Sequence, residues 1–309
     1  MDRTGSAAIT VTGLRMAYGG RTVLDGIDLH VDRGEVVALL GPNGAGKTTT
    51  VEIVEGFRRR QGGDVCVLGV DPEHGDDAWR SRLGVVLQSW RDHRRWRVRE
   101  LLTLLADTYR PYATTGAPRP RDVDDLLARV GLTAAAGQRM ATLSGGQRRR
   151  FDIAAGLVGR PELLILDEPT AGLDPAARRE FRELVHEVVD RDGTAVLLTT
   201  HDLAEAETAA DRLLLLAGGR VVADGSPSAV AHQVAGPAEV RWRAEGQQHV
   251  HSTHDPVGFT RELLARGDDV TDLEVVRASL EEAYLEIVRR HEDDPAPAGT
   301  SAGTRQEVA

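Results

Sequence analysis

Cysteine is almost absent from this chain of 309 residues, where Cys66 stands alone. A single cysteine cannot close a disulfide within the chain or complete a cysteine-rich zinc site. Nothing in the composition therefore requires an oxidising compartment, and a reducing cytoplasm is the expected location.

Long apolar runs and a secretory leader are also lacking. No apolar run approaches the ~18 to 20 residues that a membrane span needs, and the opening residues MDRTGSAAITVTG show no basic stretch followed by an apolar one. Acidic residues outnumber basic residues by 48 to 38, for a formal charge of -10. A general nucleic-acid binder needs a basic surface, so that class is not expected. Any link to a membrane is expected to go through a partner protein.

Lysine is the third scarce residue, because Lys47 is the only one among 38 basic residues. It belongs to a match to the phosphate-binding pattern G-x-x-x-x-G-K-[ST], which reads Gly41-Pro42-Asn43-Gly44-Ala45-Gly46-Lys47-Thr48. An apolar run at 36–40 precedes the match and a helical pattern from 47 to about 58 follows it. Backbone N–H groups, the helix N-terminus and Lys47 suit phosphates, and Thr48 suits Mg²⁺. The alternative is a glycine-rich turn that meets the pattern by chance.

A second candidate element combines an apolar run at 163–166 with two carboxylates, Asp167 and Glu168. Such a pair at a strand end is typical of phosphoryl-transfer sites. Asp167 is expected to orient Mg²⁺ and its waters, and Glu168 to polarise the attacking water as general base. The alternative is a strand that ends in a solvated acidic turn.

The hydrophobic pattern predicts an α/β fold, and the length is a soft prior for about two domains. We expect a main domain at 7–235 with a helical subdomain at about 89–159, a small domain at 237–290 and a disordered tail at 291–309. Further expected strands are 9–11, 23–31, 64–68, 83–87, 195–199, 212–216 and 239–243. Further expected helices are 101–109, 123–130, 175–191, 256–266 and 279–290.

Between the two candidate elements stands the pentapeptide Leu143-Ser144-Gly145-Gly146-Gln147. With it the chain clearly resembles the ATP-binding cassette (ABC) ATPases, whose signature is LSGGQ. The resemblance implies a P-loop NTPase fold with a RecA-like core, an antiparallel β subdomain and an inserted helical subdomain. It also implies that the signature caps the γ-phosphate of ATP held by a second subunit. Physically, a Ser/Gly turn at a helix N-terminus can cap an anion.

The other positions of the family pattern follow from the same resemblance. Tyr18 matches the aromatic residue that stacks on adenine, Gln88 the glutamine that touches Mg²⁺ and the attacking water, and His201 the histidine that contacts the γ-phosphate. Residues 171–174 match the loop through which the two active sites communicate. A strand tyrosine, an ordinary glutamine and a structural histidine are the alternatives. The implied ATP-binding set is Tyr18, Gly41, Pro42, Asn43, Gly44, Ala45, Gly46, Lys47, Thr48, Thr49, Ser144, Gly145, Gly146, Gln147 and Asp174.

Three segments narrow the resemblance to one branch of the family. The helix after the signature reads Arg148-Arg149-Arg150-Phe151-Asp152, where many members carry glutamine or valine-alanine pairs. An arginine-rich segment follows Gln88, and residues 279–287 read SLEEAYLEI. These features are most similar to bacterial exporter ATPases of the daunorubicin-resistance type.

Three other features keep more than one interpretation. The basic segment 91–97 fits a groove for a helix of the membrane partner, a solvated loop or, last, a nucleic-acid contact. His249, His251 and His254 are spaced for a metal on a strand, but a surface cluster is favoured because no cysteine lies near them. The short run 213–216 is interpreted as a core strand.

The sequence and its resemblance to this family predict that the chain is the ATP-hydrolysing subunit of an ABC exporter of drugs, antibiotics or lipids. One subunit cannot place both the phosphate loop and the signature on one nucleotide, so a head-to-tail homodimer with two MgATP is expected. A separate transmembrane permease is the expected partner, which places the chain at the cytoplasmic face of the membrane. The alternatives are an importer ATPase and a soluble ABC ATPase that acts on ribosomes, repair or assembly.

Overall fold

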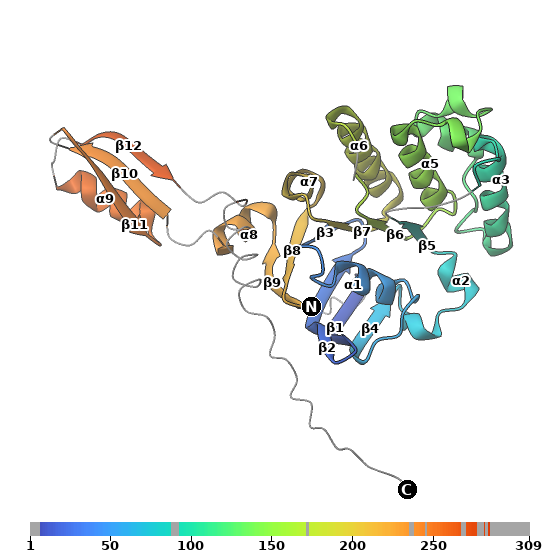
Figure 1. Cartoon of the computed structure of the whole chain (residues 1–309), viewed down its shortest axis with the longest axis horizontal. Helices are drawn as coiled ribbons and strands as arrows, with labels where there is room; N and C mark the ends of the chain where they lie inside the picture. The colour runs from blue at the N-terminus through green and yellow to red at the C-terminus, as the bar shows by residue number, and fades with distance from the viewer. Residues whose placement is uncertain are drawn as a thin grey trace, which may run out of the picture.

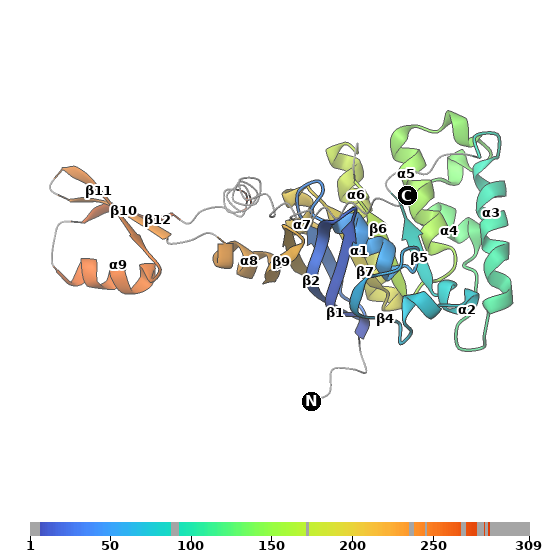
Figure 2. The same cartoon turned by 60° about the horizontal axis from the view of Figure 1, so that its bottom comes forward.

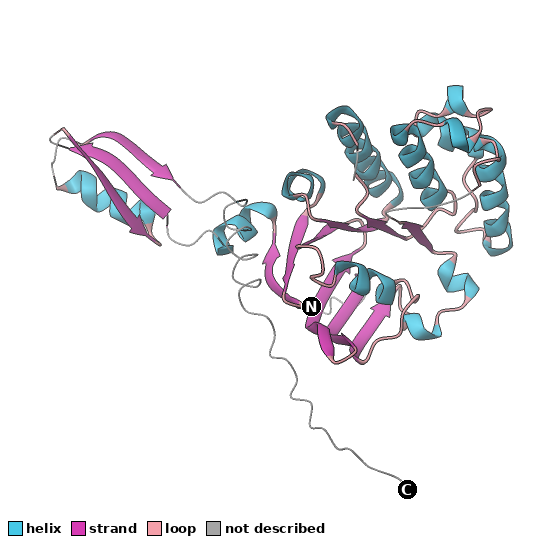
Figure 3. Cartoon of the chain, viewed as in Figure 1, coloured by secondary structure: helices cyan, strands magenta, loops and turns pink. Residues whose placement is uncertain are grey.

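The computed structural model describes residues 7–87, 93–170, 173–234, 238–244, 246–266 and 270–276, together with Glu281 and Tyr284. The described strands form three sheets, and Figure 1 shows helices on both sides of the largest one. Figure 3 separates the same elements by type.

The central sheet has the strand order β5-β6-β7-β3-β8-β9, with the first five strands parallel and β9 antiparallel to β8. Both faces of its inner strands are covered, so β3, β6, β7 and β8 are almost entirely buried. In β3, for example, Val36, Ala38 and Leu40 pack into one core while Val37 and Leu39 pack into the other. The strands are β3(Val36–Leu40), β5(Leu83–Val86), β6(Leu163–Asp167), β7(Ala195–Thr200), β8(Arg212–Ala217) and β9(Arg220–Gly225).

A smaller antiparallel sheet with the order β2-β1-β4 supplies much of the second core. A two-residue turn, Gly19-Gly20, joins β1 to β2, and both glycines have positive φ values of 54° and 85°. That geometry matches the twist of the paired strands and favours glycine. The three strands are β1(Ala7–Tyr18), β2(Arg21–Asp32) and β4(Gly62–Val67).

The helices divide between the two faces of the central sheet. Helix α1 contributes to the core shared with β1 and β2, whereas α3, α4, α5 and α6 pack into the other core. Figure 2 shows α3, α4 and α5 gathered as a helical unit beyond β5. The helices of this part are α1(Lys47–Val54), α2(Asp77–Arg80), α3(Val98–Tyr109), α4(Val123–Arg129), α5(Gly145–Leu157), α6(Pro175–Asp192), α7(Leu203–Ala209) and α8(Pro227–Val234). Within the described residues, 3-10 turns lie at Pro72–His74, Arg110–Tyr112, Thr133–Ala135 and Met140–Thr142.

Helix α1 is shorter than predicted, because it ends at Val54 and not near residue 58. Gly56 turns the chain out of the helix with φ 75°, and a Cβ there would lie 2.8 Å from the carbonyl oxygen of Pro72. A left-handed glycine with no room for a side chain is a common helix stop.

A third sheet, with the order β11-β10-β12, carries the helix α9. The predicted strand 239–243 and helix 256–266 are confirmed, whereas β12 was not predicted, and five of its six residues are exposed. Residues 281 and 284 are helical, as predicted for 279–290, and the rest of that segment and the tail 291–309 lie outside the described residues. The elements are β10(Ala238–Ala244), β11(Gln247–Thr253), α9(Pro256–Ala265) and β12(Thr271–Val276).

Two histidines of β11 stack on aromatic rings. His249 stacks on Trp242 with ring centroids 5.3 Å apart, and His251 stacks on Phe259 at 4.0 Å. Among the described residues, no group of three His, Cys, Asp or Glu side chains is arranged to hold a metal ion. The interpretation of His249, His251 and His254 as a surface cluster stays a prediction.

The apolar run 213–216 is a fully buried core strand, as predicted. Within the described part of the chain, every helix is too short or too polar to cross a membrane.

Candidate nucleotide-binding and hydrolysis site

Parallel strands bring the predicted catalytic residues to one edge of the central sheet. The carboxyl ends of β3, β6 and β7 lead directly into the loop 41–46, into Glu168 and into His201. Ligands of open α/β sheets bind outside the carboxyl ends of such strands. Gln88, which follows the neighbouring strand β5, and residues 171 and 172 lie outside the described residues.

The loop 41–46 depends on glycine at both ends. A Cβ at Gly41 would lie 2.4 Å from the carbonyl oxygen of Leu216, and one at Gly46 would lie 2.5 Å from Leu24 Cδ2. Gly46 also has φ 107° and is the N-cap of α1, with no side chain capping the helix. The loop can therefore curl close to the sheet and present the N–H groups of the first turn to an anion.

Lys47 is 6 % exposed and lies over this loop. Its Nζ donates hydrogen bonds to the carbonyl oxygens of Gly41 at 2.6 Å and Pro42 at 3.2 Å. Burial lowers the pKa of the ammonium group, and the nearby carboxylates of Glu168 and Asp167 oppose that shift. The phosphate loop and the acidic pair, about 120 residues apart in the chain, thus lie close enough for their charges to interact.

Asp167 is the last residue of β6 and is 8 % exposed. Thr199 of β7 holds it, because the Thr199 Oγ1 donates a hydrogen bond to Asp167 Oδ1 at 2.5 Å. The same threonine fixes the next residue: Glu168 N donates to Thr199 O at 3.0 Å. Carboxylate and hydroxyl oxygens are the ligands that Mg²⁺ prefers, so Asp167 and Thr48 fit the ion that was predicted for them.

Glu168 and His201 lie side by side, with Nδ1 of the histidine 3.1 Å from Oε1 of the glutamate. The Glu168 side chain is 13 % exposed and that of His201 is 53 % exposed. Glu168 has φ 45°, in the left-handed region that side chains other than glycine and asparagine rarely adopt. Backbone held in this way is a frequent property of catalytic residues.

The signature forms the N-terminus of α5, as its capping chemistry predicts. Ser144 is the N-cap: its Oγ accepts from Gln147 N at 3.2 Å, and Gln147 Oε1 accepts from Ser144 N at 3.0 Å. Asp174 similarly caps α6, through Oδ1 and Ala177 N at 2.9 Å. Among the described residues, no hydrogen bond or ion pair joins the signature residues to the loop 41–48.

Tyr18 ends β1 and is 39 % exposed, as a ring that stacks on a base must be. The Arg58 guanidinium lies over the ring, with Cζ 5.1 Å from the centroid. Arg58 Nε in turn donates to Glu52 Oε2 of α1 at 2.5 Å. The helix that follows the phosphate loop is thereby connected to Tyr18.

Arg149 is a buried residue of the site that the sequence pattern did not single out. It is 8 % exposed on α5, and its guanidinium donates to backbone carbonyl oxygens at the ends of β5 and β6. The only signal in the sequence was its place in the run of three arginines after the signature.

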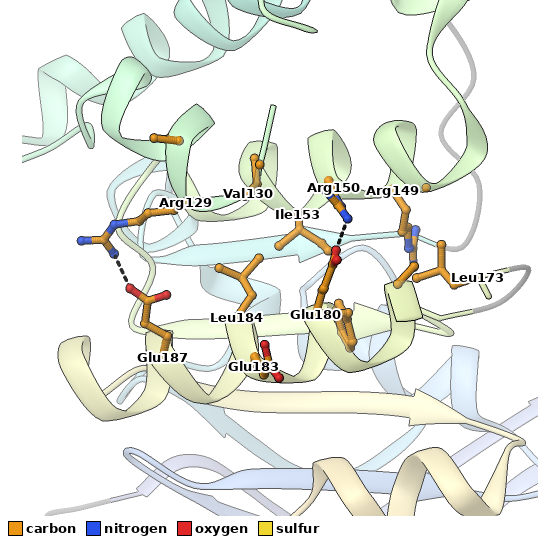
Figure 4. Close-up of a pocket in the computed structure, with 15 residues that line it drawn as sticks. Arg129, Val130, Arg149, Arg150, Ile153, Leu173, Glu180, Glu183, Leu184 and Glu187 are labelled. Atoms are coloured by element: carbon orange, nitrogen blue, oxygen red, sulfur yellow. Dashed lines mark hydrogen bonds and ion pairs between the residues drawn. The ribbon is translucent and has the colours of Figure 1, made fainter. Parts of the chain in front are cut away.

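A cavity and a groove lie next to the site. A cavity of about 350 Å³ separates α5 from α6 beside the signature, and the ion pairs Arg150–Glu180 and Arg129–Glu187 cross it (Figure 4). A smaller, mostly apolar groove of about 240 Å³ lies at the end of β5, between α3 and α5.

Comparison with known proteins shows which family this is. The family described as ABC transporter matches residues 24–171. The chain is 40% identical over 306 residues to the daunorubicin resistance ATP-binding protein DrrA3 of Streptomyces coeruleorubidus, covering 91% of this chain and 95% of that protein. It is 35% identical to the sulfate/thiosulfate import ATP-binding protein CysA of Bordetella parapertussis, over 96% of this chain and 82% of that protein.

A solved structure titled as the ATP binding subunit of an ABC transporter superimposes with a TM-score of 0.64 at 28% identity, covering 91% of this chain and 99% of that one. The chain therefore belongs to the ATP-binding proteins of the ABC transporter family. It is an ATPase of the P-loop class, and it binds and hydrolyses ATP as the nucleotide-binding subunit of a transporter. The predicted fold class and family are both confirmed.

Proposed function

We propose that this chain powers an ABC exporter by hydrolysing MgATP at the edge where β3, β6 and β7 end. The observation that carries the proposal is the meeting of Lys47, Asp167, Glu168 and His201 at that edge. The direction of transport is supported by the likeness to DrrA3, which has higher identity than the importer subunit and spans more of that relative's length.

The phosphates of ATP would lie on the loop 41–46, against the N–H groups at the start of α1. Lys47 would then exchange its carbonyl partners for phosphate oxygens, and Thr48 with Asp167 would hold Mg²⁺. Tyr18 would stack on the adenine, and Thr49 would lie in the same helical turn as Thr48. When bound, Mg²⁺ neutralises charge on the β- and γ-phosphates.

Glu168 is proposed as the general base. A water oxygen attacks the γ-phosphorus while its proton passes to the Glu168 carboxylate, and the bond to the β–γ bridging oxygen breaks, leaving ADP and phosphate. His201 orients that carboxylate at 3.1 Å and lies exposed toward the site, where it can contact the γ-phosphate. Gln88 is proposed as a further contact to the water and the ion.

A head-to-tail homodimer is proposed because the site described in one chain is incomplete. The residues 144–147 form the start of α5, whereas the phosphate loop precedes α1, which packs against the opposite face of the sheet. A two-fold axis would place each signature over the ATP of the other subunit. Asp174, at the start of α6, would lie in the same interface.

The permease is proposed to dock on the groove at the end of β5. Its wall includes the exposed Leu87, which is 47 % accessible, together with Leu105 and Tyr109. An apolar groove open to solvent suits an apolar helix face of a partner. The described part of the basic segment, 93–97, follows the same strand and supports docking at this place. The chain would accordingly lie at the cytoplasmic face of the membrane.

We also propose the organisation expected from the sequence, with an ATPase domain at 7–235, a small domain at 237–290 and a tail at 291–309. Tyr284 supports a contact between the small domain and the ATPase domain, because it packs against the core of the ATPase domain that includes α3, α4, α5 and α6. A role of residues 237–290 in dimer contacts or regulation fits that contact.

The experiment that tests this function is isolation of the E168Q variant from its native membranes with ATP and magnesium. The variant should bind ATP, form a stable dimer and lose at least 100-fold in turnover, because glutamine cannot accept the proton. Co-isolation of a polytopic membrane protein would support the transporter.

Recovery of ribosomes or nucleic acid alone would refute the transport function, and recovery together with a solute-binding protein would indicate import. Full turnover in E168Q would refute the assignment of the base. E207Q is a matched control, because Glu207 is an exposed glutamate on α7.

A further inference from the structure

Arg149 joins three parts of the site through one buried side chain. Its Nε donates to the carbonyl oxygen of Pro169 at 2.5 Å, and its Nη1 donates to that of Leu87 at 2.7 Å. Its Nη2 lies 3.3 Å and 3.2 Å from the carbonyl oxygens of Asp167 and Glu168. The guanidinium therefore contacts the loop after β6, which carries the proposed base, and the end of β5.

The backbone of Glu168 explains why several carbonyl groups meet at this point. Its left-handed conformation, φ 45°, reverses the chain so that the carbonyl oxygens of residues 167, 168 and 169 all lie within reach of one cation. Grouped carbonyl dipoles repel one another, and the left-handed conformation is unfavourable for a residue that carries a Cβ. A planar guanidinium with five N–H donors offsets both effects.

The helix that carries Arg149 begins at the signature. Ser144 caps α5 only five positions earlier, so Arg149 lies in the second turn of the helix that begins at the signature. On the side toward α6, the cavity separates the two helices, and Figure 4 shows Arg149 beside Leu173 at one end of it. The cavity thus reduces direct packing between α5 and α6 at the place where Arg149 connects α5 to the loop after β6.

We propose that Arg149 is a positioning residue, which holds the backbone of Glu168 and the end of β5 in a fixed relation to the signature helix. The inference rests on the proposed role of Glu168 as base. A displacement of the signature helix, such as capping of a nucleotide on a second subunit would produce, is passed through Arg149 to Glu168 of the same chain.

The test compares R149M and R149K with the wild-type protein in steady-state ATP hydrolysis. Methionine removes the donors, and lysine keeps the charge but cannot contact Leu87 O and Pro169 O in the same planar geometry. We expect kcat to fall about 100-fold in R149M, the loss typical of a displacement of about 1 Å. KM for ATP should change less than twofold, and R149K should recover part of kcat.

A double-mutant cycle with E168Q separates positioning of the base from a general loss of structure. If Arg149 acts through Glu168, R149M should reduce the residual single-turnover rate of E168Q less than twofold. R129M is the control, because Arg129 lies at the rim of the cavity and pairs loosely with Glu187 at 4.0 Å. It should stay within twofold of wild type.

Three results would overturn the inference. The first is a wild-type kcat in R149M, and the second is an R149M variant that lowers kcat and raises KM for ATP by the same factor. The third is an effect of R149M on the rate that is fully additive with the effect of E168Q. Wild-type turnover in E168Q alone would instead refute the proposed base. If R149M does not fold, R149K and R149Q are compared with the wild-type protein in the same assays, because each keeps a polar group in the buried site.

Discussion

Glu55 makes the stability of this protein depend on pH in a direction that can be stated in advance. It caps the C-terminus of α1, and its Oε2 is buried with no hydrogen-bond partner among the described residues. Burial, and then the neighbouring carboxylates of Glu52 and Asp167, raise the pKa of Glu55 from 4.5 to about 7. The folded state therefore keeps a proton that the unfolded chain releases.

The consequence is a loss of stability as the pH rises. Below pH 4.5 the carboxyl is protonated in both states, between 4.5 and about 7 only the folded state holds the proton, and above about 7 the loss is complete. At about 1.4 kcal/mol per pH unit, this interval corresponds to at most about 3.5 kcal/mol. Because the carboxyl is part-buried, we expect about 1 to 2 kcal/mol.

The E55Q substitution removes the ionisation while keeping the shape of the side chain. Its free energy of unfolding, measured in urea without nucleotide, should match that of the wild type near pH 4.5 and exceed it by about 1 to 2 kcal/mol at pH 8. The control E207Q alters an exposed glutamate on α7 and should show no such rise. A variant no more stable than wild type at pH 8 would contradict the reasoning.

Two further predictions concern the site. T199V removes the hydrogen bond to Asp167 and should lower kcat/KM about 10- to 100-fold, because a bond to a charged group contributes about 1.5 to 3 kcal/mol. T194V removes a buried bond at the opposite end of β7 and should leave the kinetics unchanged; equal effects of the two would show that Thr199 acts through stability alone. R58A removes the cation over Tyr18 and should raise KM for ATP about 2- to 5-fold with kcat unchanged, while R58K should recover most of the loss. An unchanged KM in R58A would argue against a role of Arg58 in holding the ring.

Much of the central sheet could be predicted because its strands are buried on both faces. Residues 36–40 and 163–166 are continuous apolar runs, and the structure confirms both as strands. The strands β9 and β12 were missed for the opposite reason. β9 has one buried residue among six and β12 has none, so neither is a continuous buried apolar run.

The candidate site was predicted unevenly. The loop 41–48 and the cap at Ser144 are local motifs, whose geometry follows from residues next to one another, and the structure places both at helix N-termini as expected. The roles of Gln88 and of residues 171 and 172 stay predictions. Arg149 was missed, because its partners are backbone carbonyls, which every sequence contains.

The sequence by itself determined the family, the phosphate loop and most of the order of strands and helices, because these depend on short-range spacing and on which residues avoid water. Only the tertiary structure decided which side chains meet across that order. Thr199 reaches Asp167 because β6 and β7 are adjacent in the sheet, although 32 positions separate them in the chain. Arg149 reaches both Leu87 and Pro169 because α5 packs where β5 and β6 end. Such contacts depend on the pairing of strands and the packing of cores, which no local pattern encodes.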